Sequence, residues 1–214
     1  MQATSDDIEA RAFIFDLLSV SFSYPSEELY QSLLDGRYAK ELAQQVSKLS
    51  NAENLADMVA QLAAYGDNDP AGDYFVFESE YINLFEYNKD APPLHPNAHL
   101  YSGDETQPVP VYQRLKSMYR DFDIDMASDR VTEQPDHLSV QLEFFAYLNR
   151  LLLVDNDEPG QQKINNALSS FCLELEWTHQ WAERVSTRPV QTFYQPLALF
   201  LLLMLERVCS KYNE

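Results

Sequence analysis

Residues 136–154 read DHLSVQLEFFAYLNRLLLV, and this stretch sets the expected fold class of the whole chain. Its apolar residues recur every three and four positions, the spacing that places side chains on one face of an α-helix. Pro135 ends the segment before it, and Asp136 is a good N-cap because its carboxylate can accept hydrogen bonds from the first N–H groups of a helix. The stretch therefore predicts a helix over 136–154.

The same spacing recurs along the rest of the chain. Only five glycines occur, and the single Asp-Gly pair, Asp35-Gly36, follows a helical pattern, so hairpin chemistry is nearly absent. Further helices are expected at about 6–22 (capped by Ser5), 26–34, 37–49, 51–65, 73–87, 110–122, 160–186 and 190–211. We predict an all-α bundle of about nine to ten helices, in which residues 1–214 form a single domain and the acidic loop at about 121–136 is a candidate hinge.

The chain is strongly acidic. Lys+Arg 15 against Asp+Glu 34 gives 15 − 34 = −19, and the region 73–136 alone holds 5 bases and 13 acids, or 5 − 13 = −8. Such a surface repels nucleic-acid phosphates and anionic membrane faces and attracts basic ligands. We therefore expect no nucleic-acid partner.

Cysteine usage and the chain start give further bounds. Cys172 and Cys209 are the only cysteines, so no disulfide framework or CxxC zinc site is expected, and both are interpreted as buried, inert thiols. The N-terminus carries acids before any base, unlike a secretory signal, and the most apolar run, 196–205, is too short to span a bilayer. A cytoplasmic protein without membrane insertion is the expectation.

Catalytic motifs are absent. The sequence contains no GxxxxGK[ST], GxGxxG, GxSxG or HExxH motif. His95 and His99 are four residues apart, but Pro96 lies between them, so hydrogen bonding within an ordered loop is preferred over a metal site. Trp177 and Trp181 share a helix face, which favours core packing over a stacking platform for a ligand. We predict that the protein is not an enzyme.

Two segments indicate a binding surface instead. The first, FESEYINLFEY at 77–87, is an aromatic-rich helical pattern that runs into NKDAPPLHPNAHLY at 88–101. Three prolines stiffen this loop, which leaves it little conformational entropy to lose on binding. Leu94, Leu100 and Tyr101 are expected to be exposed beside acidic side chains.

The second segment is EQPDHL at 133–138, at the start of the helix quoted above. His137 is expected in the first turn, where the helix dipole should lower its pKa and favour the neutral ring. A well-capped core helix with an incidental histidine is the alternative interpretation.

On these two segments the sequence resembles the TorD/DmsD/NarJ family, cytoplasmic chaperones that mature molybdenum-containing reductases. YINLF at 81–85 with the loop to HLY at 99–101, and PDHL at 135–138 leading into QLEFFAYL at 141–148, carry the resemblance. It implies a TorD-like all-helical domain that binds the twin-arginine signal peptide of an apo-reductase catalytic subunit. Binding would delay export and assist insertion of the molybdenum cofactor.

The resemblance also implies which residues bind the peptide. They are Tyr81, Leu84, Phe85, Pro96, His99, Tyr101, Glu133, Pro135, Asp136 and His137. No catalytic, metal-binding or cofactor-binding residue is expected, although the resemblance allows weak binding of guanine nucleotides. It allows either a monomer or a dimer formed by exchange of helices.

A twin-arginine peptide offers two guanidinium groups followed by an apolar stretch, so its receptor should combine carboxylates with an apolar groove. Three alternatives stay open: a NarJ-like chaperone for a reductase that is not exported, a helical adaptor with no maturation role, and a hydrolase or metal enzyme that uses His95 and His99.

Overall fold

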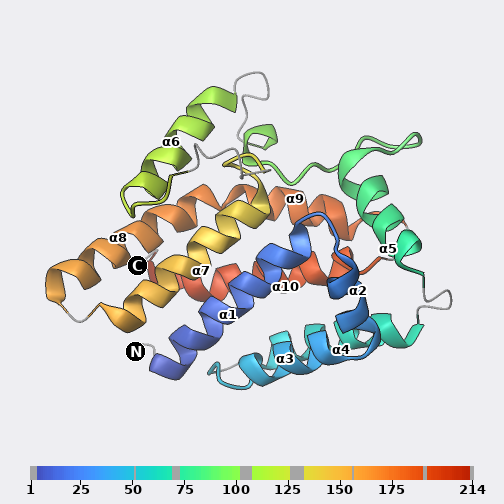
Figure 1. Ribbon diagram of the computed structural model, residues 1–214, viewed down its shortest axis with the longest axis horizontal. Helices are drawn as coiled ribbons and strands as arrows, with labels where there is room; N and C mark the ends of the chain where they lie inside the picture. Colours follow the sequence, from blue (N-terminus) through green and yellow to red (C-terminus); the bar gives the residue numbers. More distant parts are fainter. Residues whose placement is uncertain are drawn as a thin grey trace.

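The computed structural model describes residues 4–50, 52–68, 73–101, 108–125, 133–155, 157–189 and 192–212, which fold into helices and connecting loops (Figure 1). The α-helices are α1 (Ser5–Phe22), α2 (Glu27–Leu34), α3 (Arg37–Val46), α4 (Glu53–Asn68), α5 (Tyr74–Tyr81), α6 (Pro108–Arg120), α7 (Leu138–Val154), α8 (Glu158–Glu174), α9 (Trp177–Ser186) and α10 (Tyr194–Cys209). Shorter elements are the π-helix η1 (Ile82–Glu86) and the 3₁₀ turns η2 (Ala98–Leu100) and η3 (Ser210–Tyr212). No strand occurs in these ranges, and the predicted all-α class is confirmed.

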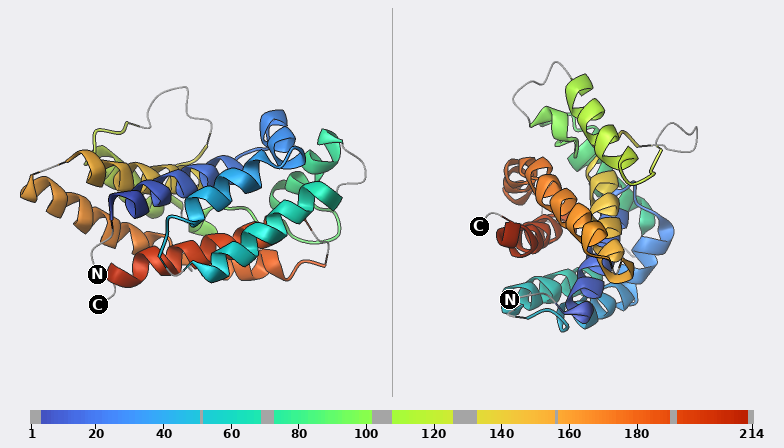
Figure 2. Two further views of the ribbon diagram at one scale, coloured as in Figure 1. Left: turned by 90° about the horizontal axis from the view of Figure 1, so that it is seen from below. Right: turned by 90° about the vertical axis from the view of Figure 1, so that its left-hand side faces the viewer.

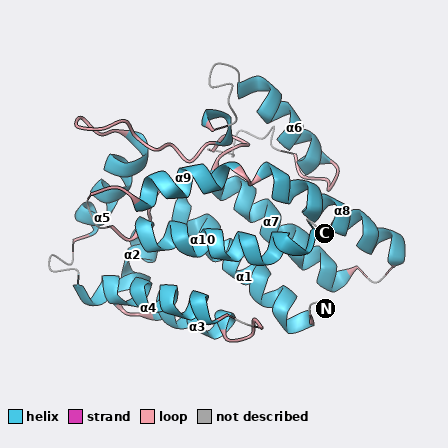
Figure 3. Cartoon of the chain, turned by 180° about the vertical axis from the view of Figure 1, so that it is seen from behind, coloured by secondary structure: helices cyan, strands magenta, loops and turns pink. Residues whose placement is uncertain are grey.

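The helices form a layered bundle. α1 lies along α7, and α10 lies between α9 and the α3–α4 pair, as the view from behind shows (Figure 3). α6 lies on the outside of the bundle against η2 (Figure 2). At the opposite end from the α7–α8 connection, α5 and η1 run into the loop that carries the prolines.

Aromatic side chains tie these layers together. Phe15 of α1 and Phe145 of α7 meet edge to face with 4.8 Å between ring centroids. Trp181 of α9 is fully buried and packs against Phe22 of α1 and Phe85 of η1. Because each of these rings removes a large apolar area from water, they fix where α1, η1 and α9 meet. The expected core role of Trp181 is confirmed.

Several helix boundaries differ from the prediction, among them the following three. The helix expected at 160–186 is two helices, because the chain turns at Leu175 and the Thr178 side chain and N–H both donate to the Leu175 carbonyl. The helix expected at 73–87 is α-helical only to Tyr81 and continues as a π-helix. The first helix is capped by Thr4 rather than Ser5, since the Thr4 hydroxyl accepts the Asp7 N–H.

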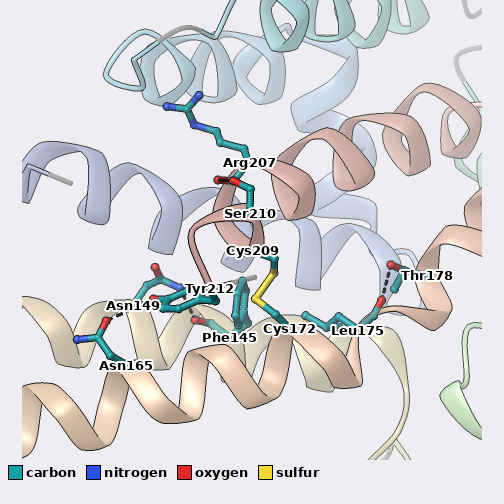
Figure 4. The surroundings of a disulfide bond; sticks show 10 residues. All are labelled: Phe145, Asn149, Asn165, Cys172, Leu175, Thr178, Arg207, Cys209, Ser210 and Tyr212. Atoms are coloured by element: carbon teal, nitrogen blue, oxygen red, sulfur yellow. Dashed lines mark hydrogen bonds between the residues drawn. A yellow bond between two sulfur atoms is a disulfide. The ribbon is translucent and has the colours of Figure 1, made fainter. Parts of the chain in front are cut away.

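The two cysteines are joined. Cys172 of α8 and Cys209 of α10 form a disulfide, with their Cα atoms 5.6 Å apart (Figure 4). The expectation of two separate thiols is therefore wrong. The pair is 37 residues apart in sequence, and only the packing of α10 against α8 brings its members together. Both cysteines lie in helical sequence patterns. These patterns are compatible with a contact between the two cysteines, but they do not predict one.

In the ranges given above, no helix has the length and apolarity that crossing a bilayer requires. Residues 126–132 of the expected hinge lie outside the described residues. The hinge and the single-domain assignment stay predictions.

Candidate functional site

The two segments singled out in the sequence lie side by side. The proline loop (88–101) runs against the turn that precedes α7, and Asn97 pairs with His137 in an isolated antiparallel bridge. The Leu138 N–H donates to the Pro96 carbonyl at 2.8 Å. Backbone hydrogen bonds of this kind fix the loop relative to α7 without depending on side-chain type. The two segments to which the resemblance assigns peptide binding thus lie against each other.

Asp136 is the centre of this junction. Its carboxylate is fully buried, and it accepts hydrogen bonds from the Asn97 side chain at 3.2 Å and the His99 N–H at 3.0 Å. The His99 Nδ1 lies 2.6 Å from the same carboxylate. The Asp136 backbone oxygen accepts from the Ala98 N–H at 3.1 Å. A buried carboxylate needs such donors, and here the proline loop supplies all of those observed.

His137, and not Asp136, is the N-cap of α7. Its Nδ1 accepts the Ser139 N–H at 3.3 Å and lies 2.7 Å from the Ser139 hydroxyl, which places the ring proton on Nε2. The Nε2 atom lies 3.9 Å from a carboxylate oxygen of Glu133. The predicted N-cap role of Asp136 is wrong because its carboxylate is already used by the proline loop.

Burial lowers the pKa of His137 below its ordinary value of 6.5. The negative charges of Glu133 and Asp136 act in the opposite direction and raise this pKa, but their effect is smaller than that of burial. The direction agrees with the sequence prediction, but the main cause is burial rather than the helix dipole.

A pH dependence follows from this lowered pKa. Since the unfolded chain binds a proton on His137 more readily than the folded chain, the His137 contribution to stability is present above about pH 6.5 and is lost as the pH falls toward the folded pKa. We expect the free energy of unfolding to fall more steeply between about pH 7 and pH 5 in the natural protein than in His137→Asn, which keeps an N-cap without the titrating ring. Urea unfolding at several pH values measures both, and equal slopes would contradict the assignment.

Aromatic residues form the wall beneath the proline loop. The Leu94 N–H donates to the Leu84 carbonyl at 2.8 Å, and the Trp181 Nε1 donates to the Leu94 carbonyl at 3.0 Å. Phe85 stacks on Trp181 and meets Tyr81 edge to face. Leu94 is buried, so its expected exposure is wrong. The loop is thus anchored to the core by a leucine that the sequence placed on the surface.

The far end of the proline loop is more open. Tyr101 is half-buried and stacks on Trp177 with 5.3 Å between ring centroids, while the Arg184 guanidinium lies 5.5 Å from the Tyr101 ring. His99 is also half-buried and meets Tyr112 edge to face. These rings extend the aromatic wall toward α6 and α9.

Acidic and aromatic side chains gather on the surface near Tyr81. Burial raises the pKa of the Tyr81 hydroxyl, and the charges of Glu133 and Glu86 raise it further. The Tyr24 ring meets the Tyr81 ring edge to face with 5.5 Å between centroids. A hydrogen bond from the Tyr24 hydroxyl to Glu78 at 2.8 Å raises the pKa of Tyr24 to about 12. We call the set formed by Tyr24, Glu78, Glu86, Tyr87 and Glu133 the acidic rim. Its tyrosines are well exposed, Tyr24 to 45% and Tyr87 to 69%.

Two cavities lie away from this junction. One is beside the disulfide and the other is lined by residues of α3, α4 and their connection. The apolar groove expected for the peptide stays a prediction. Among the described residues no group of three or more histidine, cysteine or acidic side chains could hold a metal ion, and His99 faces Asp136 while His95 is exposed.

Comparison with known proteins identifies the family. The family described as nitrate reductase delta subunit matches residues 48–184, well over half of the chain. The chain belongs to this family. The match confirms the resemblance to TorD/DmsD/NarJ proteins that the two segments indicated.

Individual relatives of this delta-subunit family member agree with the assignment. The dimethyl sulfide dehydrogenase assembly chaperone protein of Rhodovulum sulfidophilum is 26% identical, over 73% of this chain and 63% of its own length. The chain thus spans less than two thirds of that relative. A crystal structure from Archaeoglobus fulgidus, described as a redox enzyme maturation protein, covers 100% of this chain and 97% of its own with a TM-score of 0.53 and 18% identity, which supports a shared fold. The family and the assembly-chaperone relative agree with the prediction that this chain is not an enzyme.

In this family member the ten residues expected to bind peptide fall into two groups. Tyr81, Leu84, Phe85, Pro96, Pro135, Asp136 and His137 are buried, whereas His99, Tyr101 and Glu133 are half-buried. Their part in binding stays a prediction. Sequence reasoning missed Tyr24 because it lies far from the two segments along the chain, between the helices expected at 6–22 and 26–34. The sequence feature that could have indicated a role for Tyr24 is an aromatic residue directly before Pro25, at the break between two predicted helices.

Proposed function

We propose that this protein is an assembly chaperone for a molybdenum-containing enzyme and that it binds the N-terminal leader of the catalytic subunit. Family membership and the chaperone relative support the general role. The acidic rim supports the leader as ligand, because it gathers carboxylates and exposed aromatic rings on one surface of a chain with net charge −19. Bound in this way, the subunit is held back from export while its cofactor is inserted.

The chemistry of a twin-arginine leader matches this surface. A guanidinium group forms charge-assisted hydrogen bonds with carboxylates, and it also lies favourably over an aromatic ring. Glu86 and Glu133 offer the carboxylates, while Tyr24 and Tyr87 offer the rings and contact area for the apolar part of the leader. The single observation that carries the proposal is the position of the exposed Tyr24 ring, which meets Tyr81 edge to face with 5.5 Å between centroids and donates its hydroxyl to Glu78 at 2.8 Å.

The buried members of the predicted site have a positioning role in this proposal. Asp136 holds the proline loop through Asn97 and His99, and Phe85 holds η1 against Trp181. Since Glu86 ends η1 and Glu133 precedes Asp136, these contacts set the distance between the two carboxylates. Of the ten predicted residues, His99, Tyr101 and Glu133 have surface available for direct contact with the leader.

A carboxylate exchange tests the rim. We expect the double variant Glu86→Gln/Glu133→Gln to bind a synthetic twin-arginine leader about tenfold more weakly, because two partly exposed ion pairs are lost. Isothermal titration calorimetry measures the affinity, and Glu41→Gln, an exposed carboxylate of α3, is the matched control. The same affinity in the double variant and the control, or no loss of affinity when salt is raised, would contradict the proposal.

A second client type has specific support. The family description refers to nitrate reductase, so the NarJ-like alternative, in which the client subunit is not exported, remains a candidate. A leader in which both arginines are replaced by glutamine distinguishes the two. Loss of binding supports a twin-arginine client, whereas equal binding of both peptides supports recognition of another N-terminal sequence.

The remaining expectations follow from this role. A chaperone that meets its client before export acts in the cytoplasm, either as a monomer or as a dimer with exchanged helices. Weak binding of guanine nucleotide remains an expectation from the family resemblance, and the role requires no resident cofactor.

A further inference from the structure

A cavity of about 280 Å³ lies beside the disulfide, away from the acidic rim. It is lined by Cys172, Leu175, Glu176, His179, Leu205, Glu206, Cys209 and Ser210. Its volume corresponds to several water molecules at about 30 Å³ each, which is room for a molecule of a few heavy atoms. Both members of the disulfide thus border a space that a small reagent can occupy.

The two cysteines are unequally accessible. Cys172 is only 5% exposed, whereas Cys209, at the end of α10, is half-buried. Figure 4 shows the bond between α8 and the last turn of α10, with Leu175 and Ser210 near it. In thiol–disulfide exchange the accessible sulfur is attacked and the other sulfur is the leaving group. The geometry therefore assigns attack to Cys209 and departure to Cys172.

The charges around the cavity select the attacking thiol. Glu176 and Glu206 are exposed acidic residues of its lining, and the net charge of the chain is strongly negative. An anionic thiol is repelled by these carboxylates, while an uncharged or cationic one is not.

We propose that Cys172 and Cys209 form a thiol–disulfide exchange site that opens to small uncharged or cationic thiols through this cavity. With a dithiol, the first thiolate attacks the Cys209 Sγ, the Cys172–Cys209 bond breaks, and the Cys172 sulfur leaves with the electron pair and takes up a proton. The second thiol of the reagent then attacks the mixed disulfide and releases Cys209 as a thiol. The protein gains two electrons and two protons, and the dithiol becomes a cyclic disulfide.

Opening the bond leaves other interactions that hold α10 and η3 against α8. Val208 and Phe171 remain in the apolar core, and the Tyr212 hydroxyl donates to the Asn165 side chain at 3.4 Å. Reduction therefore releases the covalent tie at the end of α10 while the fold persists. The cysteine pair is a reversible covalent crosslink between α8 and the end of α10.

Kinetics on the natural protein test the site. We expect dithiothreitol to reduce the disulfide without denaturant, at a rate proportional to the dithiothreitol concentration. After reduction, an alkylating reagent should modify both cysteines, and the helical circular dichroism signal should be unchanged. Cysteamine should form the mixed disulfide about tenfold faster than the anionic 3-mercaptopropionate at equal thiolate concentration, and Glu176→Gln/Glu206→Gln should reduce this preference. A rate independent of thiol concentration shows that the bond is reached only by unfolding and overturns the proposal. Equal rates for the two reagents overturn the charge selection.

Single-cysteine variants test which sulfur is reached. In Cys172→Ser the remaining Cys209 should react with cystamine at least tenfold faster than the remaining Cys172 in Cys209→Ser. Circular dichroism checks that both variants are folded. Equal reactivity in two folded variants, or faster reaction of Cys172, overturns the assignment. If either variant does not fold, peptide mapping of the mixed disulfide that cysteamine forms with the natural protein decides: cysteamine on Cys209 supports the assignment, and cysteamine on Cys172 overturns it.

Discussion

Replacing Asp136 by alanine is expected to lower the free energy of unfolding by about 3–5 kcal/mol, the range for removing one partner of a buried charged network. The carboxylate is fully buried and joins Asn97 and His99 of the proline loop to the start of α7. Its loss removes the carboxylate that accepts the hydrogen bonds of Asn97 and His99. Urea unfolding followed by circular dichroism measures the effect.

Asp90→Ala is the matched control, because Asp90 lies in the same loop but is exposed. Its effect is expected within about 0.5 kcal/mol of zero. Asp136→Asn should fall between the two, since an amide oxygen still accepts hydrogen bonds but carries no charge. A loss below about 1 kcal/mol for Asp136→Ala would show that Asp136 does not hold the junction together.

Reduction of the disulfide is expected to lower the free energy of unfolding by about 4 kcal/mol. The two cysteines are 37 residues apart, and a crosslink that closes a loop of this size restricts the unfolded chain by roughly that amount. For a chain of this length the melting temperature should fall by about 8–16 °C. Thermal melts with and without a reductant measure the change.

The variant Cys172→Ser/Cys209→Ser is the control for this prediction. Its melting temperature should match that of the reduced natural protein and should not change when reductant is added. A melting temperature that is the same for the oxidised and reduced natural protein would show that the crosslink adds nothing to stability.

The class of fold could be predicted from local spacing alone. The pattern at 136–154 specifies a helix whatever surrounds it, and α7 begins within two residues of the expected position. The break at Leu175 could not be predicted in the same way, because it depends on the Thr178 side chain and on Trp181 reaching the core. The disulfide likewise depends on how α8 and α10 pack, which spacing along one helix does not contain.

The sequence indicated the two segments that meet at the start of α7, but not the contacts that their residues make there. Sequence patterns brought attention to the proline loop and to Asp136 and His137, and the Asn97–His137 bridge joins them. The patterns could not distinguish a carboxylate that faces a ligand from one that is buried against its own chain. That distinction needs the donors of Asn97 and His99, which come from a segment 37 to 39 residues away. Tyr24 was missed for the same reason, since only folding brings it to Glu78.

The central claim is that this protein holds the leader of a molybdenum-enzyme subunit at the acidic rim. Affinity capture of the tagged protein from its own cells, followed by mass spectrometry of the bound partner, tests it most directly. We predict capture of a catalytic subunit with its arginine-bearing leader uncleaved and its cofactor absent, and loss of that partner in Glu86→Gln/Glu133→Gln but not in Glu41→Gln. Capture of no molybdenum-enzyme subunit by the natural protein, or equal capture by the rim variant, would contradict the account.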